Sequence, residues 1–133
     1  MMKPKILVVD DDPDLLRALR LRLRAKNCEI STAADGYSAI AAAQKERPDL
    51  IILDIGLPAG DGFVVLERLQ NSDQLAGIPV IVLSARDPHG NQQRALKAGA
   101  TMFFQKPVDN EELMHMIRVS LPQWRTQAAS LPS

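Results

Sequence analysis

The sequence predicts an α/β protein with a doubly wound, five-stranded parallel sheet. Five short runs of branched apolar residues alternate along the chain with longer segments of helical period. Three of these runs, ILVV, LIIL and VIVL, are apolar at every position, as strands covered on both faces usually are. Because parallel crossovers are right-handed, the helices between the strands should cover both faces of the sheet.

The expected strands are four to six residues long, the usual length of strands in a buried sheet. No internal repeat and no second group of such runs is present, so the pattern accounts for one sheet in one domain. The five strands are expected at Lys5–Val9, Cys28–Ala33, Asp49–Leu53, Pro79–Leu83 and Met102–Gln105.

The expected helices begin and end at residues that cap or interrupt helices. Asp12 can cap the first helix, with Pro13 at its first position, and Leu16, Leu19 and Leu23 then share one face. The second is expected over Gly36–Glu46 and the third over Gly62–Asn71. The remaining boundary signals are Pro48 after the second helix, Asp61 before the third, Gly99 after the fourth, Asp109 or Asn110 before the fifth and Pro122 after it.

Length and composition fit one domain. A chain of 133 residues, 46% of them hydrophobic, can bury a single core of ordinary density. We expect residues 1–121 to form this domain and residues 122–133, which lack periodicity, to be a tail or the start of a linker.

The composition also argues against several classes of protein. The formal net charge is zero, and Lys and Arg form no cluster like those of nucleic-acid-binding proteins. Cys28 is the only cysteine, so no internal disulfide can form, and a reducing, cytoplasmic location fits best. The N-terminal apolar run meets three aspartates at once, unlike a signal peptide, and no apolar run reaches membrane-spanning length. We therefore expect neither direct nucleic-acid binding nor membrane association.

Chemically useful side chains follow four of the five expected strands. In an open parallel sheet, ligands bind outside the carboxyl ends of the strands, so these side chains should meet at one edge. They are Asp10, Asp11 and Asp12 after the first strand, Asp54 after the third, Ser84 after the fourth and Lys106 after the fifth.

Several carboxylates in one pocket repel one another and need a compensating cation to stay ionised. Oxygen ligands without His or Cys favour a hard divalent ion, and Mg²⁺ is the one that uses few carboxylates together with waters and a phosphoryl oxygen. A carboxylate such as Asp54 can also accept a phosphoryl group as an acyl phosphate. The metal, a lysine and a hydroxyl would then neutralise the phosphoryl oxygens.

Each residue also has a simpler interpretation. Asp12 is more simply a helix cap, and Asp61 in PAGDGF a turn or cap residue. A serine after a buried strand usually bonds its own backbone, and Lys106 by itself would be a solvated lysine. The functional interpretation rests on their coincidence at the strand ends.

The segments ILVVDDD, IILDIGLPAGDG, VIVLSA and GATMFFQKP resemble, in order and spacing, the receiver domains of two-component response regulators. The resemblance covers about residues 5–121. It implies a flavodoxin-like (βα)5 fold with strand order 2-1-3-4-5. It also implies signalling rather than enzymatic turnover: the receiver takes a phosphoryl group from a sensor histidine kinase, a phosphotransfer protein or a small phosphodonor, and then switches a downstream protein or a linked output domain.

The resemblance also implies individual roles. Asp54 would be the phosphorylated residue, Asp11 a direct Mg²⁺ ligand and Asp10 a ligand largely through water. The backbone carbonyl of Gly56 would be a third metal ligand, and Ser84 and Lys106 would contact the phosphoryl oxygens. Phe103 would be the switch aromatic. The Lys106–Pro107 bond would be cis.

Some positions depart from the common pattern of the family. Thr101 and Met102 stand where many receivers carry an acidic pair, which puts the salt-bridged dimer of winged-helix regulators in doubt. Pro88 and Gly90 should delay or loosen the start of the fourth helix. Arg17, Arg20 and Arg24 share a side of the first helix, either as a solvated face or as a docking stripe for a kinase.

Two other functions would use residues of the same kinds. A haloacid-dehalogenase-type phosphatase also uses an aspartyl nucleophile and Mg²⁺, but it needs an acid two residues after the nucleophile, where this chain has Gly56. A flavodoxin-like module would bind a flavin phosphate at its first loop, where three aspartates would repel it. Within the receiver interpretation, a complete single-domain regulator and a receiver followed by an output domain both fit the sequence.

Overall fold

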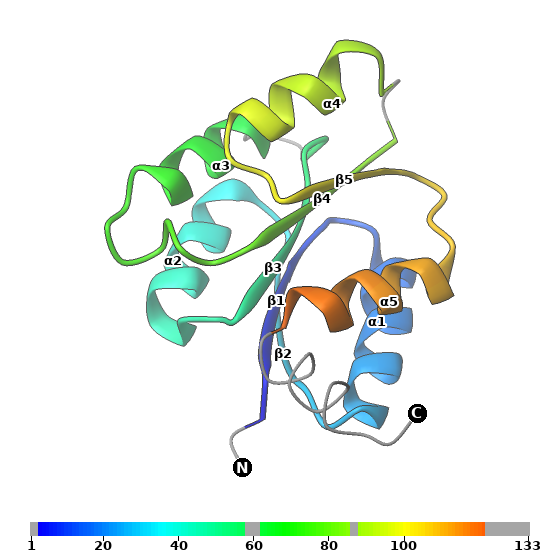
Figure 1. Cartoon of the computed structure of the whole chain (residues 1–133). Coiled ribbons are helices and arrows are strands. Elements are labelled where there is room, and N and C mark those ends of the chain that lie inside the picture. The colour runs from blue at the N-terminus through cyan, green and yellow to red at the C-terminus, as the bar shows by residue number, and fades with distance from the viewer. Residues whose placement is uncertain (1–2, 58–61, 86–87, 122–133) are drawn as a thin grey trace.

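The structure is a computed structural model that describes residues 3–57, 62–85 and 88–121. Its centre is a sheet of five parallel strands in the order β2-β1-β3-β4-β5 (Figure 1). The parallel arrangement predicted from the sequence and the strand order implied by the resemblance are both confirmed. The strands are β1 (Lys5–Val9), β2 (Glu29–Ala33), β3 (Leu50–Asp54), β4 (Val80–Ser84) and β5 (Met102–Gln105).

Helices cover both faces of the sheet (Figure 1). Helices α1 and α5 lie on one face, and α2, α3 and α4 lie on the other. None of the described helices is both long enough and apolar enough to cross a membrane. The helices are α1 (Pro13–Ala25), α2 (Gly36–Glu46), α3 (Gly62–Gln70), α4 (Pro88–Lys97) and α5 (Asn110–Ser120).

Each face of the sheet has its own core. All five residues of β3 and all five of β4 are buried, because alternate side chains enter the two cores. Leu19 and Leu23 of α1 pack with Ile117 of α5 in one core, and Leu66 of α3 belongs to the other. Burying side chains of this size contributes roughly 1.5–3 kcal/mol each, so the two cores stabilise the sheet whose carboxyl edge carries the candidate site.

The predicted helix boundaries follow local capping chemistry. Asp12 is the N-cap of α1, with its Oδ1 accepting the Asp14 N–H at 3.0 Å. Asp109, rather than Asn110, caps α5. Gly99 has a φ of +110° just after α4, as expected of a left-handed residue beyond a helix end. The proposed roles of Asp61 and Pro122 lie outside the described residues.

Two strands end one residue later than the sequence predicts. Asp54 and Ser84 are the last residues of β3 and β4, not the first residues after them. The reason is that the parallel ladder continues: Asp54 pairs with Leu83, and the Ile55 N–H donates to the Leu83 carbonyl oxygen at 3.2 Å. Both side chains are therefore positioned by the sheet itself rather than by a loop.

The start of α4 departs from helical geometry, as the sequence predicts. His89 has φ −60° and ψ 114°, and Gly90 has φ 79° and ψ −35°. Glycine adopts a positive φ without steric cost, so Gly90 permits the kink and the regular helix begins after it.

Candidate functional site

Three carboxylates meet at the carboxyl ends of β1 and β3. Oxygen atoms of Asp10, Asp11 and Asp54 all lie within 4.8 Å of one another. Asp10 and Asp54 are only 1% and 6% exposed, whereas Asp11 is exposed. The neighbouring strands β1 and β3 are directly paired, and this pairing brings together residues that are far apart in the sequence.

Both carboxylate oxygens of Asp10 have hydrogen-bond donors. Its Oδ1 accepts the Asp12 N–H at 2.9 Å, and its Oδ2 lies 2.7 Å from Nζ of Lys106. Burial raises the pKa of Asp10 above its ordinary value of 3.8, and the hydrogen bond from Lys106 opposes this shift without cancelling it. Asp10 is therefore already engaged within the protein.

Lys106 follows β5 and extends to the carboxylates. Its Nζ lies 3.4 Å from Oδ2 of Asp54, farther than from Asp10, and its backbone N–H donates to the Ser84 carbonyl oxygen at 2.7 Å. Burial lowers the pKa of Lys106, but the hydrogen bond and charge of Asp10, followed by Asp54, outweigh burial and raise the pKa above 10.5. The Lys106–Pro107 bond is cis, as the resemblance implies.

Asp54 is held in place by its own loop. Its Oδ1 accepts the Gly56 N–H at 2.8 Å. A Cβ on Gly56 would lie 3.3 Å from that oxygen, which is tighter than an ordinary contact. A glycine at this position therefore keeps the space beside the carboxylate open.

Ser84 and Phe103 lie on the two strands that follow β3 in the sheet. Ser84 is fully buried at the end of β4, which lies between β3 and β5. Phe103 of β5 is half-buried and packs against the core on the side of α2, α3 and α4. Strand β4, which carries Ser84, pairs with the strand of Asp54, and β5, which carries Phe103, pairs with β4.

The donor set fits a hard divalent cation. Three carboxylates face one ammonium group, so negative charge remains for a metal to neutralise. All the side-chain donors are oxygens, which favour Mg²⁺ over softer metals. Asp12, in contrast, serves as the helix cap that the simpler interpretation predicted.

Asp10 is the nearer of the two carboxylate partners of Lys106, a pairing that was not predicted from the sequence. These two residues are separated by 96 positions, and no spacing rule links them. The imbalance of charge between the aspartates and the lysine was the one signal that could have suggested a pairing.

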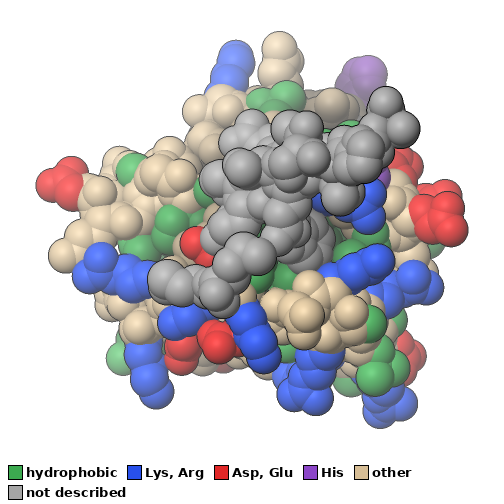
Figure 2. Space-filling view, turned by 60° about the horizontal axis from the view of Figure 1, so that its bottom comes forward, with side chains coloured by type: hydrophobic (Ala, Val, Ile, Leu, Met, Phe, Trp, Pro, Cys, Tyr) green, Lys and Arg blue, Asp and Glu red, His purple; other side chains and the backbone are tan. Residues whose placement is uncertain are grey.

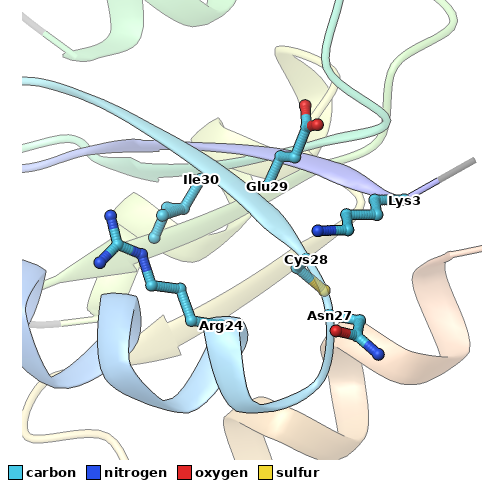
Figure 3. A pocket seen from close by; sticks show the side chains of 6 residues that line it. All are labelled: Lys3, Arg24, Asn27, Cys28, Glu29 and Ile30. Atoms are coloured by element: carbon cyan, nitrogen blue, oxygen red, sulfur yellow. The ribbon is translucent and has the colours of Figure 1, made fainter.

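A separate cavity of about 530 Å³ lies at the amino-terminal end of β2, away from the carboxylate cluster (Figure 3). Burial raises the pKa of its Cys28 thiol to about 11, so this thiol is a poor nucleophile and a poor metal ligand. Ligands in this fold bind at the other end of the strands. The residues that line this cavity are Lys3, Arg24, Asn27, Cys28, Glu29 and Ile30.

The arginines predicted to share one side of α1 are all exposed. Arg20 donates to the Thr32 hydroxyl of β2 at 3.4 Å, and Arg24 borders the cavity. Figure 2 turns the lower end of the molecule forward and shows Lys and Arg side chains gathered on its lower half, with a few acidic ones among them. This mixture is compatible with a solvated face and with a docking surface.

Comparison with known proteins identifies relatives over most of the chain. Residues 6–118 match the family described as response regulator receiver domain. The response regulator PleD of Caulobacter vibrioides is 39% identical over 117 residues, covering 88% of this chain and 26% of PleD. The transcriptional regulatory protein PrrA of Mycobacterium tuberculosis is 39% identical over 127 residues, covering 96% of this chain and 54% of PrrA. The chain thus spans about a quarter of one relative and about half of the other.

Solved structures share the same architecture. The chemotaxis response regulator CheY4 of Vibrio cholerae superposes with a TM-score of 0.83 at 31% identity, covering 90% of this chain and 100% of that chain. The beryllofluoride-activated N-terminal receiver domain of RstA from Klebsiella pneumoniae gives a TM-score of 0.81 at 29% identity, covering 90% and 99%.

Proposed function

The chain belongs to the response regulator receiver family, and on this basis we propose that Asp54 is its phosphoryl acceptor. A receiver is a phosphoacceptor signalling module, not a turnover enzyme, and its family implies a histidine kinase as partner. The donor would be the phosphohistidine of that kinase or of a phosphotransfer protein, or a small phosphodonor. The observation that carries the proposal is the position of Asp54 among Asp10, Asp11 and Lys106.

The transfer would make one bond and break one bond. An oxygen of the Asp54 carboxylate bonds to phosphorus while the phosphorus–nitrogen bond of the phosphohistidine breaks. The imidazole leaves with the electron pair and takes up a proton, and the product is an acyl phosphate. Such a transfer needs alignment and charge neutralisation more than covalent assistance from the protein.

The neighbouring residues supply alignment and charge. The Gly56 N–H holds Oδ1 of Asp54, and Oδ2 lies on the side of Lys106. We propose that the Lys106 ammonium and the Ser84 hydroxyl contact the phosphoryl oxygens, because donors to charged oxygens form the stronger hydrogen bonds.

We propose Mg²⁺ as the cofactor of this site. Asp11, Asp54 and the Gly56 carbonyl would hold the ion directly. Asp10 would act through water, which agrees with both of its oxygens already having donors. When bound, the ion would neutralise charge on the carboxylates and the phosphoryl oxygens.

Labelling with acetyl phosphate and Mg²⁺ tests the acceptor. Mass spectrometry should find one added phosphoryl group on the wild-type chain and none on Asp54→Ala. Asp73→Ala is the matched control, because Asp73 is an exposed aspartate outside the carboxylate cluster, and it should label like the wild type. Undiminished labelling of Asp54→Ala would refute the assignment.

We propose that Ser84 and Phe103 form the switch. A phosphoryl group on Asp54 would attract the Ser84 hydroxyl, and the half-buried Phe103 ring would then turn inward, because burying a large apolar side chain gains roughly 1.5–3 kcal/mol. The change would be a shift between existing populations. Adding beryllofluoride should therefore change the amide NMR chemical shifts of Phe103 and of α5. Shifts confined to the carboxylate cluster would exclude this switch.

We also propose that residues 1–121 form the receiver domain and that residues 122–133 are a tail or the start of a linker. Leu121 is fully buried in the core of α1 and α5, which supports a boundary after it. Limited proteolysis should cut after residue 121 and leave a chain of unchanged melting temperature. A loss of folding after that cut would show that the domain extends beyond residue 121.

We propose a cytoplasmic location, which would suit the free, buried Cys28.

A further inference from the structure

Helix α4 has little buried surface of its own with which to hold its position. His89 and Gly90 break its backbone, which leaves residues 91–97 as the continuous helix. Ala95 is its fully buried apolar residue, and an alanine side chain buries little area. A helix this short is unstable in isolation, so contacts with neighbouring elements must hold it in place.

Arg94 makes such a contact with α3. Its guanidinium carbon lies 3.8 Å from the centroid of the Phe63 ring, within the range of a cation–π interaction. Helices α3 and α4 lie side by side on the same face of the sheet (Figure 1). The contact therefore ties the middle of α4 to the first turn of α3.

Phe63 is in turn fixed to the loop that follows Asp54. It is 1% exposed, and the preceding Gly62 donates its N–H to the Ile55 carbonyl oxygen at 3.2 Å. A Cβ on Gly62 would lie 2.2 Å from the Cα of Ile55, so the backbone of Gly62 packs too closely on that of Ile55 to leave room for a side chain. Because this close packing and the hydrogen bond join the two segments, a displacement of Ile55 toward Gly62 would push on the start of α3.

The loop is itself hydrogen-bonded to Asp54, because the Gly56 N–H donates to Asp54 Oδ1. A phosphoryl group on this carboxylate would change the charge and position of that acceptor. We propose that Arg94 couples the state of Asp54 to α4, with Phe63 as the intermediate. This inference rests on the proposed phosphorylation of Asp54. It runs through α3 and is separate from the Ser84 and Phe103 switch.

Amide hydrogen exchange, with and without beryllofluoride and Mg²⁺, tests the coupling. Arg94→Met removes the cation and keeps a side chain of similar length. Lys97→Met is the matched control: it lies on the same exposed helix and loses the same charge, and Lys97 has no ring contact or ion pair among the described residues. Arg94→Lys retains a cation for the ring and serves as the rescue variant.

In the wild type, the exchange rates of the amides of residues 92–97 should differ between the chain with beryllofluoride and Mg²⁺ and the chain without them. Arg94→Met should speed this exchange about two- to thirtyfold without beryllofluoride, as expected for loss of a cation–π contact. It should also remove most of the difference between the forms, whereas Lys97→Met should keep that difference and Arg94→Lys should restore part of it.

A merely structural Arg94 would give faster exchange in both forms by the same factor. That result would overturn the proposal, as would wild-type α4 amides that do not respond to beryllofluoride. The Gly56 amide separates the two hypotheses. If Gly56 responds in every variant while the α4 response persists in Arg94→Met, the coupling is wrong and the acceptor stands. If Gly56 never responds, the proposed function fails and the coupling fails with it.

Discussion

The ammonium nitrogen of Lys106 lies 2.7 Å from Oδ2 of Asp10 and 3.4 Å from Oδ2 of Asp54. Asp10 is 1% exposed, so its charge depends on this partner. Lys106→Met should therefore destabilise the fold without metal by about 1–3 kcal/mol, because it leaves a buried carboxylate without its cation. Urea unfolding at neutral pH measures the loss. Lys97→Met, on an exposed face, should change stability by less than about 0.5 kcal/mol, and equal effects of the two variants would contradict the pairing.

Mg²⁺ should stabilise the folded chain by ~2.7 kcal/mol at one hundred times its dissociation constant, because the carboxylate cluster exists only in the folded state. Asp11→Asn should remove most of this gain. Without metal the same variant should be neutral or stabilising, since it relieves repulsion among three carboxylates. Thermal unfolding with and without Mg²⁺ would reveal this opposite effect. Asp14→Asn, outside the cluster, should keep the full metal response.

The stability of the cap of α2 should depend on pH. The Ser38 N–H, and then the Ser38 hydroxyl, hold the pKa of Asp35 below 3.8. A lowered folded pKa means that the contribution of Asp35 is present above about pH 3.8 and is lost as the pH falls through the folded pKa. Asp35→Asn keeps a capping side chain but removes the charge. Its deficit in urea midpoint should be present at pH 6 and should vanish in strong acid, and a deficit independent of pH would contradict the charge argument.

Gly62→Ala should be strongly destabilising, by more than about 2 kcal/mol, because the new Cβ would lie 2.2 Å from backbone atoms of Ile55. Backbone atoms cannot give way as a flexible side chain can. Gly77→Ala is the matched control, since a Cβ there meets nothing within 4 Å. Gly77→Ala should be neutral or slightly stabilising. Similar chemical denaturation curves for the two variants would show that the close approach has been misjudged.

Cys28 should be unreactive in the folded chain. Burial raises its pKa to about 11, so only about one thiol in a thousand is thiolate at pH 8. A chromogenic disulfide reagent should therefore react slowly in buffer and rapidly in urea. Lys3→Ala would open the adjacent cavity, so a faster reaction of this variant in buffer would show that access of the reagent, as well as the pKa of the thiol, limits the rate. Rapid reaction of the native wild type would contradict the burial.

Local patterns determined the order and type of the elements. The apolar runs of β1, β3 and β4 are long enough to identify buried strands, and the pair Asp12–Pro13 marks the start of α1. The kink at Gly90 was also predictable, because proline and glycine act on their own backbone. These signals are local, so one sequence suffices to read them.

It was also predictable that Asp10, Asp11, Asp54 and Lys106 would lie near one another, because the carboxyl ends of parallel strands must share one edge of the sheet. The distances within it were not. Only the tertiary structure decides that Lys106 lies nearer to Asp10 than to Asp54, and only it places the ring of Phe63 beneath Arg94. These contacts join residues on different strands and helices, and their geometry depends on how both cores pack against the sheet. Sequence order determines which residues reach the edge, and packing determines which of them touch.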